Sequence, residues 1–251
     1  MNKDDDFYVG YMPQAPASLA RWLRPRIALL LVLVAAIALL LASAQGPLGP
    51  GNFDFGAEDS FEGVVYTHPY PMLRVARPGA SGHLPAYSLY YLTVFGKHGA
   101  NQACAGLDGQ RVRLKGAIIY RDNQVMIEMV DGSIESLGEG EALQAGDLGM
   151  LTVSGEIVDS KCFLGVMKPG NLKTHKACAI RCISGGVPPV LLVRDPEGNA
   201  HYFMLTDTAG AAVNGRVLDK VATPLRITGR LGRLDNLFTL AADPDAYVLQ
   251  R

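Results

Sequence analysis

Residues 155–189 are the most chemically concentrated stretch of this chain, with three of its four cysteines and one of its five histidines. These residues are Cys162, His175, Cys178 and Cys182. Thiols form disulfides, carry redox chemistry when ionised, and bind zinc together with imidazoles. The segment therefore has three interpretations: a structural disulfide, a metal site, or thiol redox chemistry.

A short helix is expected to carry three of these residues. Residues 175–182 (HKACAIRC) are predicted to be helical, with Thr174 as the N-cap. His175, Cys178 and Cys182 then share one stripe of the helix, because they lie at positions i, i+3 and i+7.

The same spacing limits which disulfides can form. Side chains at i and i+4 of a helix are about 5–6 Å apart at Cβ, whereas a disulfide needs about 3.8 Å. Cys178 and Cys182 are therefore not expected to bond to each other, and Cys162 is the natural partner of one of them. Cys104, in the first half of the chain, either pairs with the remaining cysteine or stays free.

A metal site is limited in the same way. Seven residues of helix rise about 10 Å, so His175 and Cys182 are not expected to reach one ion. The set Cys162, His175 and Cys178 remains as the candidate for a metal ion, and no other cofactor is expected.

The cysteine-rich segment is also basic. A thiol beside Lys176, Arg181 or a helix N-terminus would have a lowered pKa, which would suit a redox role, although the chain has no C-x-x-C motif. The segment is expected to bind an anion or an acidic partner surface, with a plain solvated loop as the alternative. The residues of this candidate surface are Lys161, Lys168, Lys173, Lys176, Arg181, Gly185 and Gly186.

Other polar residues give weaker signals. Glu156 and Asp159 lie three apart on a predicted strand, so they face opposite sides and do not form an obvious acid–base pair. Lys97-His98-Gly99 is expected to be a turn without chemistry. The chain has no Ser-His-Asp signature, no phosphate-binding glycine loop and no H-E-x-x-H motif, so an enzyme is not favoured.

Short β-rich runs bounded by Gly, Pro, Asn and Asp dominate the chain after residue 60. The predicted strands are 61–66, 87–94, 111–119 and 124–129, followed by 151–158, 190–193, 201–205, 225–231 and 237–241.

The two sets of strands resemble each other, and each contains strands with a central glycine. Such a glycine is costly unless the strand bends sharply, as at the corner of a small barrel. The fold is therefore predicted to be mainly β, with an N-terminal transmembrane helix followed by two tandem OB-like barrels. A single β-sandwich is the alternative. The modules are predicted to be 59–139 and 149–251, with a connector at 140–148 and an insertion at 161–186 in the second.

An apolar segment precedes the modules. Residues 27–44 carry no charge and just span a bilayer core of about 30 Å. Arg21, Arg24 and Arg26 precede the segment, and the next basic residue is Arg74, so the positive-inside rule places 1–26 in the cytoplasm.

The rest of the chain is then expected in the periplasm, on a bacterial inner membrane, behind a Gly/Pro-rich tether at 45–58. A signal peptide cleaved after Ala44 is the alternative, and it exports the same residues.

The run VDSKCFLGVMKPG, followed by THKACAIRCISGGVPP, resembles a motif of uncharacterised bacterial proteins anchored by one membrane span. The resemblance covers the second module and brings no activity with it. In architecture, one span followed by an exported small barrel is similar to the haem chaperone of cytochrome c maturation. That family attaches haem at a histidine in its C-terminal segment. The tail of this chain, PDAYVLQR, has no histidine, so a haem role is not implied.

These observations favour a membrane-anchored binding or assembly factor, whose partners are the bilayer through 27–44 and another envelope or membrane protein. Its disulfide-braced basic loop would be the contact surface. The alternative is an envelope redox or metal-binding protein that uses the Cys/His cluster. Nucleic-acid binding is disfavoured by the net charge of −1 and the export signal.

Overall fold

The computed structural model describes residues 16–44, 49–77, 86–143 and 145–250. Parts of the predicted cytoplasmic tail (1–15), tether (45–48) and connector (144) lie outside the described residues. The chain divides into two units, Met1–Pro47 and Leu48–Arg251.

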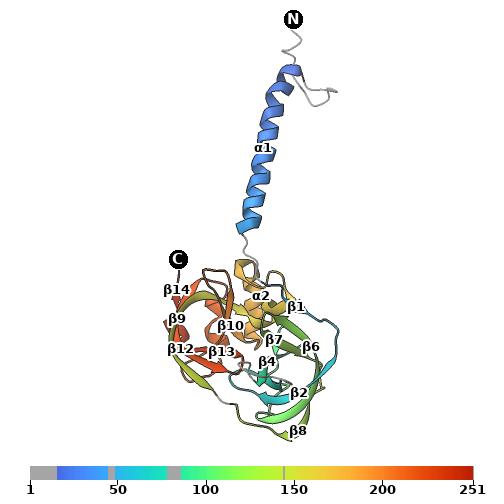
Figure 1. Ribbon diagram of the computed structural model, residues 1–251, viewed down its shortest axis with the longest axis vertical. Helices are drawn as coiled ribbons and strands as arrows, with labels where there is room; N and C mark the ends of the chain where they lie inside the picture. Colours follow the sequence, from blue (N-terminus) through green and yellow to red (C-terminus); the bar gives the residue numbers. More distant parts are fainter. Residues whose placement is uncertain (1–15, 45–48, 78–85, 144, 251) are drawn as a thin grey trace. The chain divides into compact units, whose positions relative to one another are not determined.

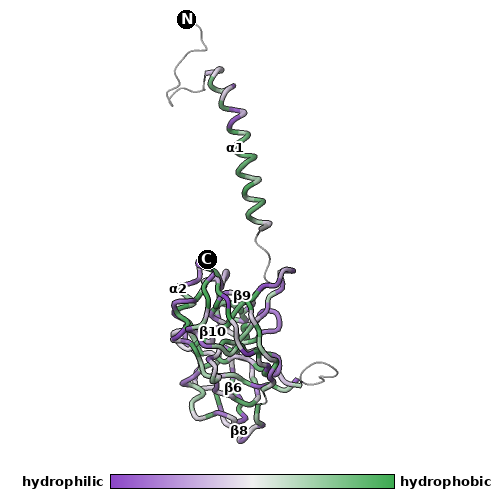
Figure 2. Tube along the Cα trace, turned by 90° about the vertical axis from the view of Figure 1, so that its left-hand side faces the viewer, coloured by the Kyte–Doolittle hydropathy of each residue, from purple (hydrophilic) through white to green (hydrophobic). Residues whose placement is uncertain are grey.

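Helix α1 (Ala17–Ala44) is the one described helix long and apolar enough to cross a membrane. An 18-residue window within Ala17–Ser43 has a mean hydropathy of 2.7, and Figure 2 shows the apolar character along most of the helix. The helix begins before the predicted span, and it includes the basic residues Arg21, Arg24 and Arg26. There the Arg26 guanidinium lies 3.8 Å from the centre of the Trp22 ring.

The first barrel closes through five strands, in the order β2-β3-β4-β7-β6 and back to β2. These strands are β2 (Asp59–Tyr66), β3 (Met72–Ala76), β4 (Tyr87–Val94), β6 (Gln110–Arg121) and β7 (Gln124–Met129). Three short strands are added at its edges: β1 (Asn52–Phe53), β5 (His98–Gly99) and β8 (Glu135–Glu139).

The second barrel repeats this order as β9-β10-β11-β13-β12 and back to β9. Its strands are β9 (Gly146–Asp159), β10 (Pro189–Arg194), β11 (Ala200–Thr206), β12 (Leu225–Leu234) and β13 (Leu237–Ala241), with β14 (Val248–Leu249) at the edge. Single helical turns follow β11 and β13: η3 (Asn214–Arg216), η4 (Leu218–Lys220) and η5 (Pro244–Ala246).

The topology confirms the prediction of two tandem OB-like barrels, and the alternative of a single β-sandwich was wrong. In each barrel the strands that come third and fifth along the chain pair in parallel (β4 with β7, β11 with β13). The other barrel pairs are antiparallel. Figure 1 shows the first barrel in cyan and green beside the second in yellow to red. Strand β3 is not among the strands that the sequence predicts.

The mid-strand glycines occupy equivalent close approaches in the two barrels. A Cβ on Gly63 of β2 would lie 2.3 Å from the carbonyl oxygen of Arg74, and one on Gly155 of β9 would lie 2.3 Å from that of Leu192. No side chain fits at either place, because a carbonyl oxygen of the next strand lies against the glycine. This shared device supports the internal repeat.

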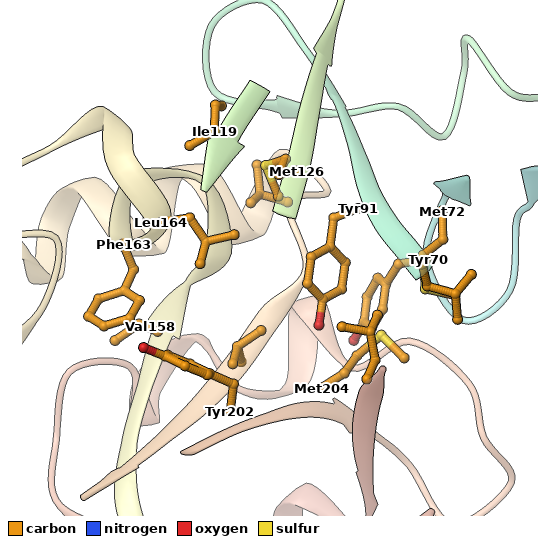
Figure 3. Close-up of a cluster of buried hydrophobic side chains, with 14 of the residues drawn as sticks. Tyr70, Met72, Tyr91, Ile119, Met126, Val158, Phe163, Leu164, Tyr202 and Met204 are labelled. Atoms are coloured by element: carbon orange, nitrogen blue, oxygen red, sulfur yellow. The ribbon is translucent and has the colours of Figure 1, made fainter. Parts of the chain in front are cut away.

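Three apolar cores hold the second unit together. One fills the first barrel, around Leu73, Val112 and Ile127, and one fills the second, around Leu191 and Leu240. The third lies between the barrels and takes side chains from both, as Figure 3 shows. Its labelled members are Tyr70, Met72, Tyr91, Ile119, Met126, Val158, Phe163, Leu164, Tyr202 and Met204. Since this shared core is as buried as the barrel interiors, the barrels form one structural unit.

Polar contacts fix the register between the barrels. The Tyr70 hydroxyl donates to the Leu205 carbonyl at 2.7 Å, and Arg74 pairs with Asp235 at 2.8 Å. The predicted tether also joins the fold from Gly49 onward. Asn52 and Phe53 form β1 and pair with β6, so this part of the predicted tether belongs to the fold.

The predicted insertion lies between β9 and β10, and it contains a π-helical turn, η2 (Cys162–Val166), and helix α2 (Leu172–Ser184). Residues Phe163 and Leu164 of η2 enter the core between the barrels, and the Arg121 side chain of β6 donates to the Phe163 carbonyl at 2.8 Å. The insertion is therefore part of the joint between the barrels.

Candidate thiol site between the barrels

The site starts where β9 ends, at a fully buried carboxylate. Asp159 accepts the backbone N–H of Cys162 on one oxygen at 2.8 Å, and its other oxygen lies 3.0 Å from the Nε2 atom of His175. Both Asp159 and His175 are buried. One carboxylate thus ties the start of η2 to the first turn of α2, which sets the position of Cys162 against that helix.

The three sulfurs of the insertion lie together, with Cys162 as the shared neighbour. The Sγ atom of Cys162 is 3.8 Å from that of Cys178 and 3.8 Å from that of Cys182. All three sulfurs lie within 4.8 Å of one another. Cys162 and Cys182 are buried, whereas Cys178 is partly exposed, so the cluster has one sulfur near solvent.

A lysine from the first barrel completes this cluster. The Lys97 ammonium, in the turn between β4 and β5, donates a hydrogen bond to the Cys178 sulfur at 2.6 Å. This bond raises the pKa of Lys97 above its ordinary value, against the opposing effect of desolvation. The turn that was expected to carry no chemistry therefore supplies a cation to the thiol site.

Hydrogen bonding between two buried thiols separates their acidities. The hydrogen bond with Cys182 is the main cause that raises the pKa of Cys162, and burial adds to it. The same bond lowers the pKa of Cys182. Cys104 lies apart from the cluster, in the core of the first barrel, where burial raises its pKa to about 11. Cys104 is thus an inert core thiol, and it does not lock the two modules together.

No pair of cysteines is at disulfide distance. A disulfide needs a sulfur separation of about 2.05 Å, and the contacts of Cys162 are at 3.8 Å. All four cysteines are free thiols in this structure.

The candidate metal set is regrouped by the structure. Among the described residues, two groups could hold an ion: one is Cys162, Cys178 and Cys182, and the other is Asp159, Cys162 and His175. The predicted set had combined Cys162 and Cys178 with His175, and it had left out Cys182. Helical rise does keep His175 and Cys182 in different groups, as the sequence indicated. Cys162 bridges the groups because it comes from a different element and faces the middle of the stripe.

The sequence predicted Lys161 to be part of an exposed basic surface. In the structure it is buried. Its side chain is 3% exposed, and its ammonium donates to the carbonyls of Val94 and Gly96 at 2.7 Å each and pairs with Glu128. All three partners belong to the first barrel. Lys161 therefore pins the insertion to that barrel through a satisfied buried charge.

The predicted glycines of the surface also serve the joint. Gly185 accepts the backbone N–H of Gly99 at 3.0 Å, and a Cβ on Gly185 would lie 2.0 Å from the Lys97 carbonyl. Gly186 has a φ of +98°. Gly185 must be glycine for the close approach that brings Lys97 to Cys178, and the N–H groups of Gly185 and Gly186 donate to carbonyls at the end of α2. Of the predicted basic residues, Lys168, Lys173 and Arg181 are exposed, and Lys176 is partly buried beside Thr223.

Helix α2 begins earlier than predicted and has a different cap. It starts at Leu172, with Asn171 at the N-cap position, and Thr174 lies inside the first turn. The carboxylate of Glu156 accepts the backbone N–H of Leu172 at 3.1 Å. Desolvation raises the pKa of Glu156, although this bond opposes the shift. Glu156 thus holds the start of α2, and Asp159 holds the start of η2 and the first turn of α2.

Sequence reasoning missed Asp159 and Lys97 as members of the site. Asp159 had a local signal, since an aspartate three residues before Cys162 is placed to accept its backbone N–H, as in an N-cap. Lys97 had none, because it lies in the other barrel.

Comparisons of the chain with protein-family models, with curated proteins and with solved structures find no match.

Proposed function

We propose that this chain is a membrane-anchored, exported protein that binds one thiophilic metal ion, of the Zn(II) or Cu(I) class, through Cys162, Cys178 and Cys182. The observation that carries the proposal is the spacing of the sulfurs. Two thiolates about 2.3 Å from an ion, at a tetrahedral angle, lie roughly 3.8 Å apart. Cys162 has that separation from both of its neighbours.

Charge supports the same assignment. Three thiolates around a divalent ion leave one negative charge, and a buried charge is costly unless it is paired. The Lys97 ammonium lies at hydrogen-bond distance from one of the three sulfurs and would compensate that charge. Soft thiolate ligands also select Zn(II) and Cu(I) over Mg(II) and Ca(II).

Hydrogen bonds around the three sulfurs resemble those that orient the ligands of metal sites. Asp159 holds both the backbone at Cys162 and the imidazole of His175, so two elements that carry the group are fixed against each other. Such supporting contacts change metal affinity by about 10–100-fold when they are removed.

Helix α1 supports the proposed location at a membrane. Helix α1 is long and apolar enough to span a bilayer, and the arginines before its apolar part favour a cytoplasmic N-terminus. The barrels would then lie on the outer side of a bacterial inner membrane. We therefore narrow the expected role of a binding or assembly factor to that of a metal-binding protein with an envelope or membrane partner. The partly exposed Cys178 offers a route for the ion, and the exposed Lys168, Lys173 and Arg181 remain the candidate contacts for an envelope or membrane partner.

The test is a metal titration of the reduced full-length chain in detergent, with Zn(II) and Cu(I) each measured by competition with a chromophoric chelator. We expect one ion per chain and an affinity loss of about 100-fold for Cys162→Ser, Cys178→Ser and Cys182→Ser. Cys104→Ser is the matched control and should bind as the wild type does. The proposal would be refuted if the chain failed to compete with the chelator for either ion, or if all four variants had equal affinities.

A further inference from the structure

The three sulfurs differ in access and in neighbours, and this difference suggests a second activity. Cys178 is the only one of the three that is partly exposed, while Cys162 and Cys182 are buried. Cys162 alone touches both of the others, at 3.8 Å in each case. A group entering from solvent therefore meets Cys178 first, and Cys162 lies in contact with both Cys178 and the buried Cys182.

We propose that the cluster is a three-cysteine disulfide relay, whose external partner is a disulfide, either of another protein or of a small thiol. The Cys178 thiolate attacks that disulfide, which releases one external thiol and leaves Cys178 in a mixed disulfide. Cys162 then attacks the Cys178 sulfur, which releases the second external thiol and forms a bond between Cys162 and Cys178. Cys182 attacks the Cys162 sulfur and frees Cys178, so that the final disulfide is buried.

The balance is that of a two-electron exchange. One external disulfide is reduced to two thiols, and the thiols of Cys162 and Cys182 are oxidised to one disulfide, with their two protons passing to the released thiols. The reverse sequence oxidises two external thiols to a disulfide and returns Cys162 and Cys182 to thiols, with the steps in the opposite order. Cys178 is unchanged at the end, so it acts as the exchange residue while the other two store the oxidising equivalents.

Geometry allows each step with small movements. Closing a contact of 3.8 Å to a bond of about 2.05 Å requires less than roughly 2 Å of motion. The last exchange requires the Cys162 sulfur to move into the line between Cys178 and Cys182, which lie within 4.8 Å of each other. Direct bonding of Cys178 to Cys182 is disfavoured by their i, i+4 spacing on α2, which leaves Cys162 as the pivot.

The relay deepens the proposed function, because the disulfide and the ion use the same sulfurs. Insofar as it regulates metal binding, it rests on that function: oxidation would remove two of the three ligands and release the ion. The exchange itself needs no metal and can be tested in its absence.

The test starts from the reduced full-length chain in detergent with a metal chelator. Oxidised glutathione is added, free thiols are blocked with N-ethylmaleimide at set times, and the bonds are mapped by peptide mass spectrometry. We expect the wild type and the Cys104→Ser control to end with a bond between Cys162 and Cys182. Cys182→Ser should stop with a bond between Cys162 and Cys178, and Cys162→Ser should stop with glutathione on Cys178.

Cys178→Ser should still form the buried bond, but about tenfold or more slowly, because the accessible thiol is lost. Two results would overturn the relay: an internal disulfide in Cys162→Ser, or an unchanged rate in Cys178→Ser. Far-UV circular dichroism of each reduced variant shows whether it is folded. Because the metal titration is done under reducing conditions and the exchange without metal, each proposal fails independently of the other.

Discussion

Lys97 and Cys178 belong to different barrels, yet the Lys97 ammonium lies 2.6 Å from the Cys178 sulfur. The contact depends on the docking of the barrels, because the turn that carries Lys97 packs against Gly185 at the end of α2. The charge at the thiol site is therefore set by the joint between the barrels as well as by the insertion itself.

Replacing Lys97 tests this dependence. Lys97→Met removes the cation while keeping much of the side chain, so the negative charge of three thiolates around a divalent ion is left unpaired. We expect the affinity for Zn(II) to fall by about tenfold or more in the chelator competition. Lys176→Met is the matched control, since Lys176 is a partly buried lysine of α2 that contacts Thr223 rather than a sulfur. Equal losses in the two variants would contradict a specific role for Lys97.

Lys161 gives a prediction about stability. Lys161→Met would leave the carboxylate of Glu128, which is 13% exposed, without its buried partner. Breaking a buried pair in this way costs about 3–5 kcal/mol in the free energy of unfolding, measured by urea denaturation in detergent. The double variant Lys161→Met, Glu128→Gln removes the uncompensated charge and should recover part of the loss. If the double variant loses the sum of the two single effects, the two residues are not coupled.

Much of the fold could be predicted because its signals are local. Nine of the ten barrel strands were read from β-rich runs bounded by turn residues, and the mid-strand glycines indicated the barrel corners. Strand β3 escaped because Pro69, Pro71 and Pro78 surround it, and such residues are typical of loops. The helical spacing also placed His175, Cys178 and Cys182 on one stripe.

The joint between the barrels could not be predicted, because its contacts join residues far apart in the chain. No pattern around Lys161 distinguishes a lysine that reaches three partners in another module from a solvated one. The spacing of His175, Cys178 and Cys182 likewise says which residues share a face, but not what that face meets. Only the packing of η2 against α2 decides that Cys162 sits between the other two sulfurs.

The mid-strand glycines give a third prediction. Gly155→Ala would place a methyl group 2.3 Å from the Leu192 carbonyl oxygen, so the strands must separate. Overpacking of this kind costs about 1–3 kcal/mol in the free energy of unfolding. Gly63→Ala, at the equivalent place in the first barrel, should behave alike. Gly215→Ala is the control, because a Cβ at Gly215 meets nothing within 4 Å, and its effect should stay within about 0.5 kcal/mol of zero.

Glu156 gives a prediction about pH. Desolvation raises the pKa of Glu156 in the folded chain, so the folded state binds its proton more tightly than the unfolded state does. The contribution of Glu156 to stability is then fully present below its unfolded pKa of about 4.3, and it is lost as the pH rises through the folded pKa. Glu156→Gln removes this titration but keeps an oxygen that can accept the Leu172 N–H. Urea unfolding between pH 4 and 7 should therefore show the wild type losing stability relative to Glu156→Gln as the pH rises.

Glu156→Ala also loses the helix cap and should be about 1 kcal/mol less stable than Glu156→Gln at every pH in the series. A wild-type stability that rises relative to Glu156→Gln over this pH range would show that the hydrogen bonds from Leu172 and Asn171 outweigh the burial of the carboxylate.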